Sequence, residues 1–193
     1  YNDWSQLEAQ RKAVKSYDTS GHVILCHAFT KSLAPGLRLG WMHAGRWTMR
    51  VKELREAQLA MPTAVLQLAL ANLIGQGGHA AHMRRCRQLA AARLREARGL
   101  VLKHFPPGIK LNPSASGLML WLQLPPEADA EDFHKRCLQE GILVPPGRYF
   151  SPSKRYGNCC RIAVGHWGDA HRKGLIRMGQ LAWECVQPQR LTA

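Results

Sequence analysis

The sequence contains no long hydrophobic run, few aromatic residues and few acidic ones. No apolar stretch reaches the roughly 18 uncharged residues typical of a membrane-spanning helix, so a soluble, cytoplasmic protein is expected. Aromatic residues make up only 7% of the chain. Asp and Glu number 13 against 27 Lys and Arg, which leaves a formal net charge of +14. Such an excess of positive charge favours binding to phosphates.

The cysteines, histidines and glycines lack the spacing of the common functional motifs. The six cysteines contain no CxxC pair, so reduced thiols are expected rather than a disulfide framework or a zinc site. GxGxxG after a strand, GxxxxGK, GxSxG and HExxH are also missing. His79, His82 and Cys86 could share one face of a helix, but no fourth ligand accompanies them, and no metal site is predicted.

The composition otherwise suits a globular α/β protein. With 193 residues, of which 46% are hydrophobic, the chain is long enough for one or two domains. Hydrophobic periodicity, glycine and proline indicate where its elements begin and end. Helices are predicted over residues 49–60, then past Pro62 to 74, and over 79–104, 130–140 and 169–185; strands are predicted over 109–112, 117–124, 142–144 and 159–164.

Lys31 follows an apolar run at residues 23–29, which begins after Gly21. A run of this kind predicts a buried strand of the parallel type, and ligands bind at the carboxyl ends of such strands. An amine placed there can attack a carbonyl group and form a Schiff base. Thr30 adds a hydroxyl and Arg38 a guanidinium, which together could bind a phosphate. The spacing alone also fits a solvated lysine and arginine on a surface loop.

The sequence LAPGLRLGW at residues 33–41, directly after this lysine and Ser32, resembles the lysine segment of fold type I pyridoxal-phosphate enzymes. The resemblance is strongest to the aminotransferase-like domain of the MocR subfamily of GntR-type regulators and to 2-aminoadipate-type aminotransferases. It implies the C-terminal part of the fold type I transferase fold, with the end of the cofactor-binding large domain at residues 1–45 and long helices with a small α/β domain at 46–193. Three later segments resemble family landmarks in the same order: GLMLWL at 117–122, VPPGRYF at 144–150 and CRIA at 160–163.

The resemblance implies roles for individual residues. Lys31 would carry pyridoxal 5'-phosphate as an internal aldimine, and Thr30 and Arg38 would bind the cofactor phosphate. Arg161 would bind the α-carboxylate of an amino acid. One residue departs from the family pattern, since Ala28 stands where Ser or Thr usually precedes the lysine by three positions.

Tyr1 has the family's spacing for the tyrosine that bonds to the ring hydroxyl of the cofactor. In the family an aspartate that pairs with the pyridine nitrogen lies just upstream of that tyrosine, and an aromatic stacking residue lies earlier still. If Tyr1 is this tyrosine, the chain is a fragment that holds about half of the cofactor site. Weak or no transamination is then expected from the chain by itself.

The resemblance leaves two functions within one fold. The first is the effector domain of a GntR/MocR-type regulator, which binds an amino acid or amine and reads DNA through an upstream winged helix-turn-helix domain outside this sequence. The second is a genuine aminotransferase of the 2-aminoadipate or aromatic amino acid type, in which Lys31 also acts as the general base. Either protein would be a homodimer at full length. The Gly-Arg-Trp at residues 45–47 favours the regulator.

The basic residues leave a remote third alternative, a nucleic-acid-binding module without a cofactor. The predicted helix over 79–104 is rich in arginine, and within the regulator the contact of Arg84, Arg85 and Arg87 with long DNA is a hypothesis. Leucine and alanine fill the opposite stripe, so a solvated helix face explains the same pattern.

Overall fold

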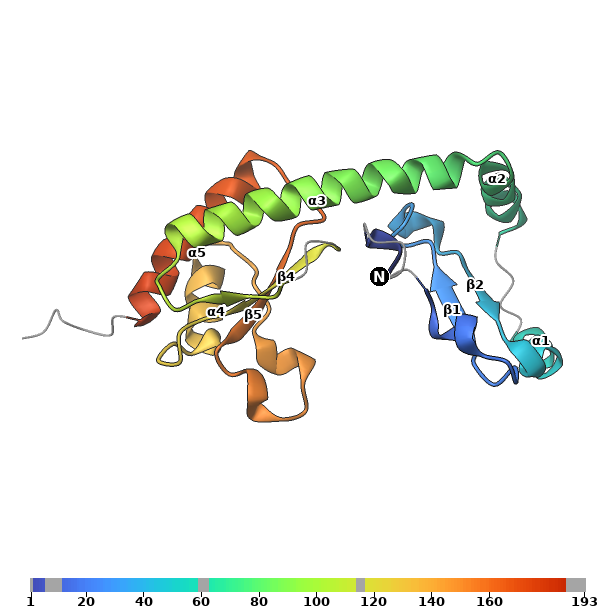
Figure 1. Ribbon diagram of the computed structural model, residues 1–193, viewed down its shortest axis with the longest axis horizontal. Helices are drawn as coiled ribbons and strands as arrows, with labels where there is room; N and C mark the ends of the chain where they lie inside the picture. The colour runs from blue at the N-terminus through green and yellow to red at the C-terminus, as the bar shows by residue number, and fades with distance from the viewer. Residues whose placement is uncertain (1, 6–11, 59–62, 114–116, 187–193) are drawn as a thin grey trace, which may run out of the picture. The chain divides into compact units, whose positions relative to one another are not determined.

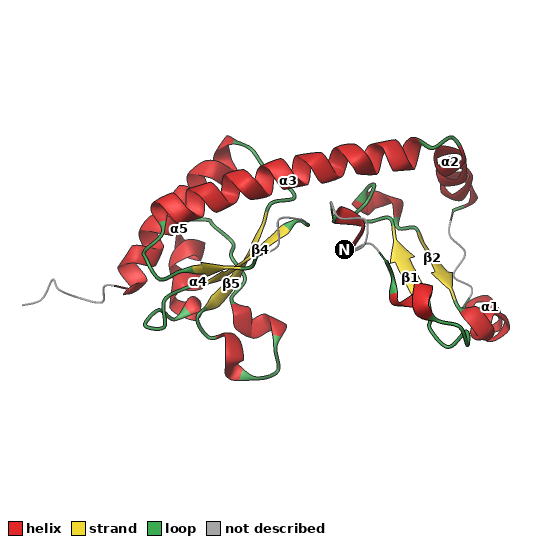
Figure 2. Cartoon of the chain, viewed as in Figure 1, coloured by secondary structure: helices red, strands yellow, loops and turns green. Residues whose placement is uncertain are grey.

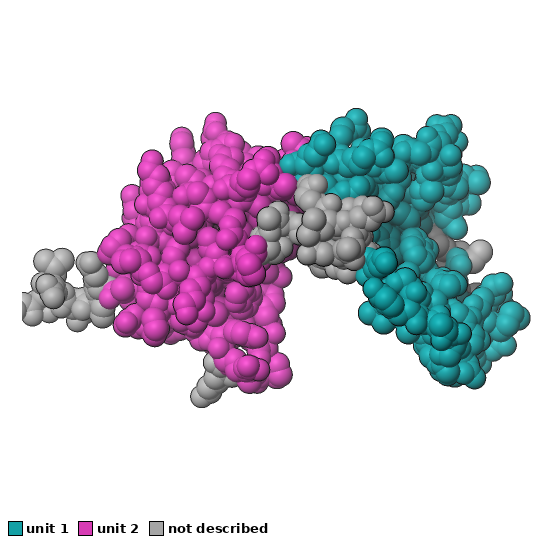
Figure 3. All heavy atoms as spheres, viewed as in Figure 1, with its two compact units in different colours: residues 1–88 teal, residues 89–193 magenta. Residues whose placement is uncertain are grey.

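The computed structural model describes residues 2–5, 12–58, 63–113 and 117–186. The chain divides into two compact units, residues 1–88 and residues 89–193 (Figure 3). Helix α3, Gly78–His104, contributes residues to both units. Among the described residues, no helix combines the length and the apolar character that crossing a membrane requires.

The first unit contains a two-stranded sheet and short helices (Figures 1 and 2). The predicted break at Pro62 lies outside the described residues. The elements are the 3-10 helices η1 (Asn2–Trp4), η3 (Val14–Tyr17), η4 (Pro35–Leu37) and η5 (Gly45–Trp47), the strands β1 (Leu25–Ala28) and β2 (Gly40–His43), and the helices α1 (Thr48–Ala57) and α2 (Ala64–Gly75).

Strand β1 forms within the apolar run, but its environment differs from the predicted one. It pairs antiparallel with β2, with Ala28 opposite Gly40, and its residues alternate between half-buried and exposed. The connection at residues 29–39 explains the direction, because a link this short returns the chain beside its own strand whereas a parallel pair needs a longer crossover. Gly40 makes this close return feasible, since a Cβ there would lie 2.5 Å from the carbonyl oxygen of His27.

The second unit contains a three-stranded antiparallel sheet in the order β3-β4-β5. Alternation along β4 and β5 divides its side chains between two faces. One face packs on the helices, and the other lies beside η6 and η7. The elements are β3 (Lys110–Leu111), β4 (Met119–Gln123), α4 (Ala130–Gln139), η6 (Gly147–Phe150), η7 (Lys154–Tyr156), β5 (Cys159–Ala163) and α5 (Asp169–Val186).

A single hydrophobic core holds the second unit together. Its largest fully buried side chain is Phe133 of α4. Helix α4 begins where the sequence predicted because the carboxylate of Asp129 accepts a hydrogen bond from the backbone N–H of Glu131 at 3.0 Å. The other core residues come from each packed element: Leu94, Ala97 and Val101 of α3, Leu120 and Leu122 of β4, Cys160 and Ile162 of β5, and Leu175, Met178 and Leu181 of α5.

The predicted strand at residues 142–144 does not form. Only one isolated bridge, between Pro146 and Cys160, and a hydrogen bond from the Arg161 N–H to the Pro145 carbonyl at 3.1 Å connect this segment to β5. Pro145 and Pro146, which directly follow the segment, account for the missing strand because neither has an N–H to donate to a ladder. Val144 of this segment is nevertheless buried in the core of the second unit.

Candidate functional site

Lys31 lies in the turn that directly follows β1. The turn is closed by two hydrogen bonds of Phe29, whose N–H donates to the Leu39 carbonyl at 3.0 Å and whose carbonyl accepts from the Leu33 N–H at 2.8 Å. Phe29 is buried and Lys31 is exposed. The turn therefore has a fixed backbone, while the amine is accessible.

Arg38 lies on the same loop, between η4 and β2. It is the only residue other than glycine, among the described part of the chain, with a positive φ, at 48°. Such a conformation is uncommon for a residue with a Cβ, and it occurs often at binding sites. Arg38 is exposed and Thr30 is half-buried. The loop from β1 to β2 thus carries Thr30, Lys31 and Arg38, and their joint contact with a phosphate stays a prediction.

These side chains fit an aldehyde that carries a phosphate. Lys31, Thr30 and Arg38 offer a primary amine, a hydroxyl and a guanidinium, which are the groups that bind a carbonyl carbon and phosphate oxygens. Ala28, exposed at the end of β1, contributes no hydroxyl to this set. Ser32 has a hydroxyl that is buried without a hydrogen-bond partner among the described residues.

The buried side of the turn contacts the beginning of α3. The ring of His79 packs edge-on against Phe29, with ring centroids 5.8 Å apart. Burial lowers the pKa of His79, and the neighbouring His82 lowers it further. His82 Nε2 lies 3.0 Å from the Ser32 carbonyl oxygen and 3.2 Å from Cys86 Sγ.

These histidines and the cysteine do not form a metal site. No group of three or more His, Cys, Asp or Glu side chains with the geometry of a metal site occurs among the described residues. The sequence pattern indicated only a shared helix face. The contact of His82 with the lysine turn was not predicted, because it joins segments about 50 residues apart that only the packing of α3 brings together.

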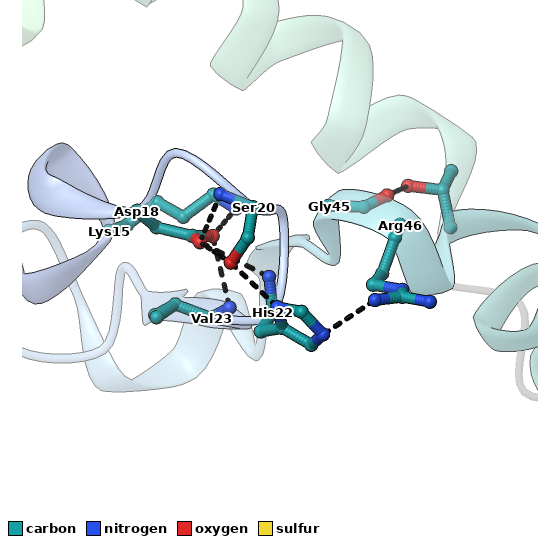
Figure 4. Close-up of polar contacts among 8 residues, drawn as sticks. Lys15, Asp18, Ser20, His22, Val23, Gly45 and Arg46 are labelled. Atoms are coloured by element: carbon teal, nitrogen blue, oxygen red, sulfur yellow. Dashed lines mark hydrogen bonds and ion pairs between the residues drawn. The ribbon is translucent and has the colours of Figure 1, made fainter.

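The loop that leads into β1 is fixed by Asp18 (Figure 4). Its carboxylate accepts hydrogen bonds from Lys15 Nζ at 2.6 Å, the Val23 N–H at 3.0 Å and the His22 N–H at 3.2 Å. The bond from Lys15 is the largest of the influences that hold the pKa of Asp18 far below its ordinary value. The Gly-Arg-Trp segment at 45–47 forms η5, and the Arg46 guanidinium contacts the His22 ring.

Arg161 lies in β5 of the second unit, on the sheet face turned away from the buried Cys160 and Ile162, as the alternation predicted. Its guanidinium carbon lies 4.5 Å from the ring centroid of Phe150. The Nε atom is buried and has no hydrogen-bond partner among the described residues. Arg161 also lines a cavity of about 310 Å³, together with Trp167.

The three later sequence landmarks meet around this arginine. Trp121 of β4 is opposite Arg161 in the sheet register. The Trp121 ring packs edge-on against Phe150 and Tyr156, at centroid distances of 5.7 and 5.3 Å. Segments that lie far apart in the sequence thus form one aromatic surface beside a guanidinium.

Three of the sequence predictions are not tested by this geometry. Tyr1 lies outside the described residues, so its contact with a cofactor ring stays a prediction. Lys31 and Arg161 belong to different compact units, and each is described within its own unit. The division at residue 45 also stays a prediction.

Comparison with known proteins agrees with the resemblance in the sequence. HTH-type transcriptional regulator YdcR of Escherichia coli, described as uncharacterized, is 30% identical over 171 residues, which cover 88% of this chain and 36% of the regulator. HTH-type transcriptional regulator TauR of Rhodobacter capsulatus is 34% identical over 171 residues, which cover 87% of this chain and 35% of the regulator. The chain therefore spans about a third of the length of these relatives.

Solved structures support the same fold. The kynurenine aminotransferase of Pyrococcus horikoshii, solved in complex with PMP, superposes with a TM-score of 0.83 at 24% identity, over 100% of this chain and 47% of that one. The partial fold type I fold expected from the sequence is thereby confirmed. A sequence profile of class I and II aminotransferases matches residues 3–172. The chain belongs to the class I and II aminotransferase family, whose cofactor is pyridoxal phosphate.

Proposed function

We propose that this chain is part of the aminotransferase-like effector domain of a GntR/MocR-type transcriptional regulator, with pyridoxal 5'-phosphate attached to Lys31. The observation that carries the proposal is the loop between β1 and β2, which contains Thr30, Lys31 and Arg38 and whose backbone is held by hydrogen bonds of Phe29. The similarity to regulators over most of the chain supports it.

The residues of the loop have separate tasks. When bound, pyridoxal phosphate supplies an electron sink for negative charge at the α-carbon of an amino acid. The Thr30 hydroxyl and the Arg38 guanidinium would donate hydrogen bonds to the phosphate, and Arg38 would do so from a backbone with positive φ. The Lys31 amine holds the cofactor and can take up or release a proton at Nζ.

Arg161 binds the carboxylate of the ligand in this proposal. Its side chain extends from one face of β5, and the guanidinium packs over the Phe150 ring, which restricts its orientation. The buried Nε donor of Arg161 has no hydrogen-bond partner among the described residues, and a carboxylate would supply the missing acceptor, since a buried donor without one costs free energy. An amino acid therefore fits the site better than an amine without a carboxylate.

The partners follow from the proposed class of protein. Occupation of the site by an amino acid would shift the domain arrangement of a homodimer, and a winged helix-turn-helix domain upstream of this chain would read the DNA. The alternative is an aminotransferase of the 2-aminoadipate or aromatic amino acid type, which is also consistent with the match of the family profile. The gene decides between them: a winged helix-turn-helix domain encoded upstream supports the regulator, and a start codon close to the cofactor fold supports the enzyme.

Attachment of the cofactor to Lys31 is tested by chemical trapping. The full-length protein is incubated with pyridoxal phosphate, reduced with borohydride and digested, and the peptides are mapped by mass spectrometry. We expect the pyridoxyl group on Lys31 and its loss in Lys31→Arg, because a guanidinium does not form the Schiff base. Lys110→Arg, at an exposed lysine of β3, is the matched control and should keep the adduct. An unmodified Lys31 in the parent protein would contradict the proposal.

A further inference from the structure

Helix α3 supports the lysine turn from its buried side. Met83 of this helix is 3% exposed, and Phe29 of the turn is 5% exposed. His79 and His82 lie on the same side of α3, three residues apart, and each contacts the turn. The helix therefore holds a defined position against the residues that flank Lys31.

A hydrogen bond at the Ser32 carbonyl fixes the residue after Lys31. The His82 Nε2 atom lies 3.0 Å from this oxygen, in a partly buried setting. A carbonyl oxygen only accepts, so the imidazole hydrogen must be on Nε2 for this bond to form. The nearby Cys86 sulfur at 3.2 Å is then a second, weaker acceptor for the same hydrogen.

The backbone on both sides of Lys31 is therefore held by hydrogen bonds. On one side Phe29 makes two backbone hydrogen bonds within the loop. On the other side the Ser32 carbonyl is held by a side chain of another element. The exposed Lys31 side chain thus extends from a short backbone segment with little freedom.

We propose that His82 is a positioning residue for Lys31, which holds the turn so that the amine is presented to the cofactor. The inference rests on the proposed attachment of pyridoxal phosphate to Lys31. His82 acts through the Ser32 carbonyl and has no contact with the cofactor in this role. Without its N–H, the buried carbonyl loses its partner, and the turn can shift toward conformations in which the carbonyl meets water.

The test compares two substitutions of similar size in the full-length protein. His82→Met keeps side-chain volume and helix propensity but has no donor, and His82→Gln has an amide N–H that can reach the same carbonyl. Cys86→Ala, which removes the other neighbour of Nε2, is the control. Pyridoxal phosphate is the probe. Its dissociation constant is measured by absorbance titration, and the yield of the Lys31 adduct by borohydride reduction and peptide mapping.

We expect His82→Met to weaken cofactor binding by about tenfold and to lower the adduct yield, as the loss of one partly buried hydrogen bond implies. His82→Gln should bind within about threefold of the parent, and Cys86→Ala as the parent does. A purely structural role would affect the Met and Gln variants alike, so equal behaviour of the two overturns the inference. If the parent itself forms no adduct on Lys31, the proposed function fails, and the inference fails with it. If the parent forms the adduct on Lys31 and His82→Met binds the cofactor as the parent does, the inference is wrong and the proposed function stands.

Discussion

At the scale of single residues, the chain contains charged groups whose environment departs from that of a surface side chain. Asp18 is the clearest case, because its carboxylate is 2% exposed and accepts bonds from an ammonium group and from backbone N–H groups. Nothing in the sequence around residue 18 distinguishes it from a solvated turn aspartate. Its role depends on the conformation of the loop, which places the backbone N–H of Val23 within hydrogen-bond distance of the carboxylate. The sequence pattern does not reveal this conformation.

Asp18→Asn is expected to lower the free energy of unfolding at neutral pH. The folded-state pKa of Asp18 is depressed, so its contribution is fully present above the unfolded-state pKa of about 3.9 and is lost as the pH falls through the folded-state pKa. The difference between parent and variant should therefore shrink at pH 3 and below. Urea unfolding followed by circular dichroism at pH 7, 5 and 3 measures it.

Glu53→Gln is the control for Asp18→Asn. The Glu53 carboxylate is exposed and pairs with Arg50 on the same helix, and such pairs contribute little to stability. We expect a smaller change at pH 7 than for Asp18→Asn. A loss in Asp18→Asn that is the same at every pH would contradict the assigned role of its charge.

At the scale of elements, hydrophobic periodicity and the breaks at glycine and proline predicted the helices well. Helix α3 begins and ends within one residue of the prediction, because Gly77 and the segment after His104 interrupt helical geometry. Periodicity does not report which elements touch. The contact between α5 and the end of α3, at Gly179, is a result of packing that the sequence left open.

Two glycines of α5 should respond in opposite ways to alanine. At Gly179 a Cβ would lie 2.7 Å from the His104 carbonyl oxygen, whereas nothing lies within 4 Å of a Cβ at Gly174. Gly179→Ala should lower the free energy of unfolding by about 1–3 kcal/mol through overpacking. Gly174→Ala should raise it by up to about 1 kcal/mol through helix propensity. Denaturant unfolding measures both, and a stabilised Gly179→Ala variant would show that α5 does not pack closely against the end of α3.

At the scale of the whole molecule, the net charge is +14. Some of the basic side chains bond to other parts of the fold, and others are exposed. Arg87, Arg93 and Arg98 of α3 donate to carbonyl oxygens of Asp3, Gly165 and Asn112. These arginines stabilise the fold, and contact of Arg87 with DNA stays a prediction.

Arg84 and Arg85 remain candidates for nonspecific phosphate contacts in the full-length protein. Both are exposed and have no ion pair among the described residues. If they contact DNA, replacing both with Gln should reduce the slope of log binding constant against log salt concentration by about 2. Lys135→Gln with Lys173→Gln, at exposed positions of α4 and α5, is the control. An unchanged slope in the arginine variant, measured by fluorescence anisotropy on a long duplex, would reject the contact.

The sequence by itself determined the family, the fold class and the candidate lysine, because the segment at 30–41 combines a strand end, a turn and distinctive residue types within a short stretch of chain. Local information of this kind also fixed the helices and the face of Arg161. Only the tertiary structure decided that β1 pairs antiparallel with β2, that Trp121 and Phe150 adjoin Arg161, and that His82 contacts the Ser32 carbonyl. These contacts join segments distant along the chain, and their free energy depends on burial and on the positions of partner atoms that no local pattern encodes.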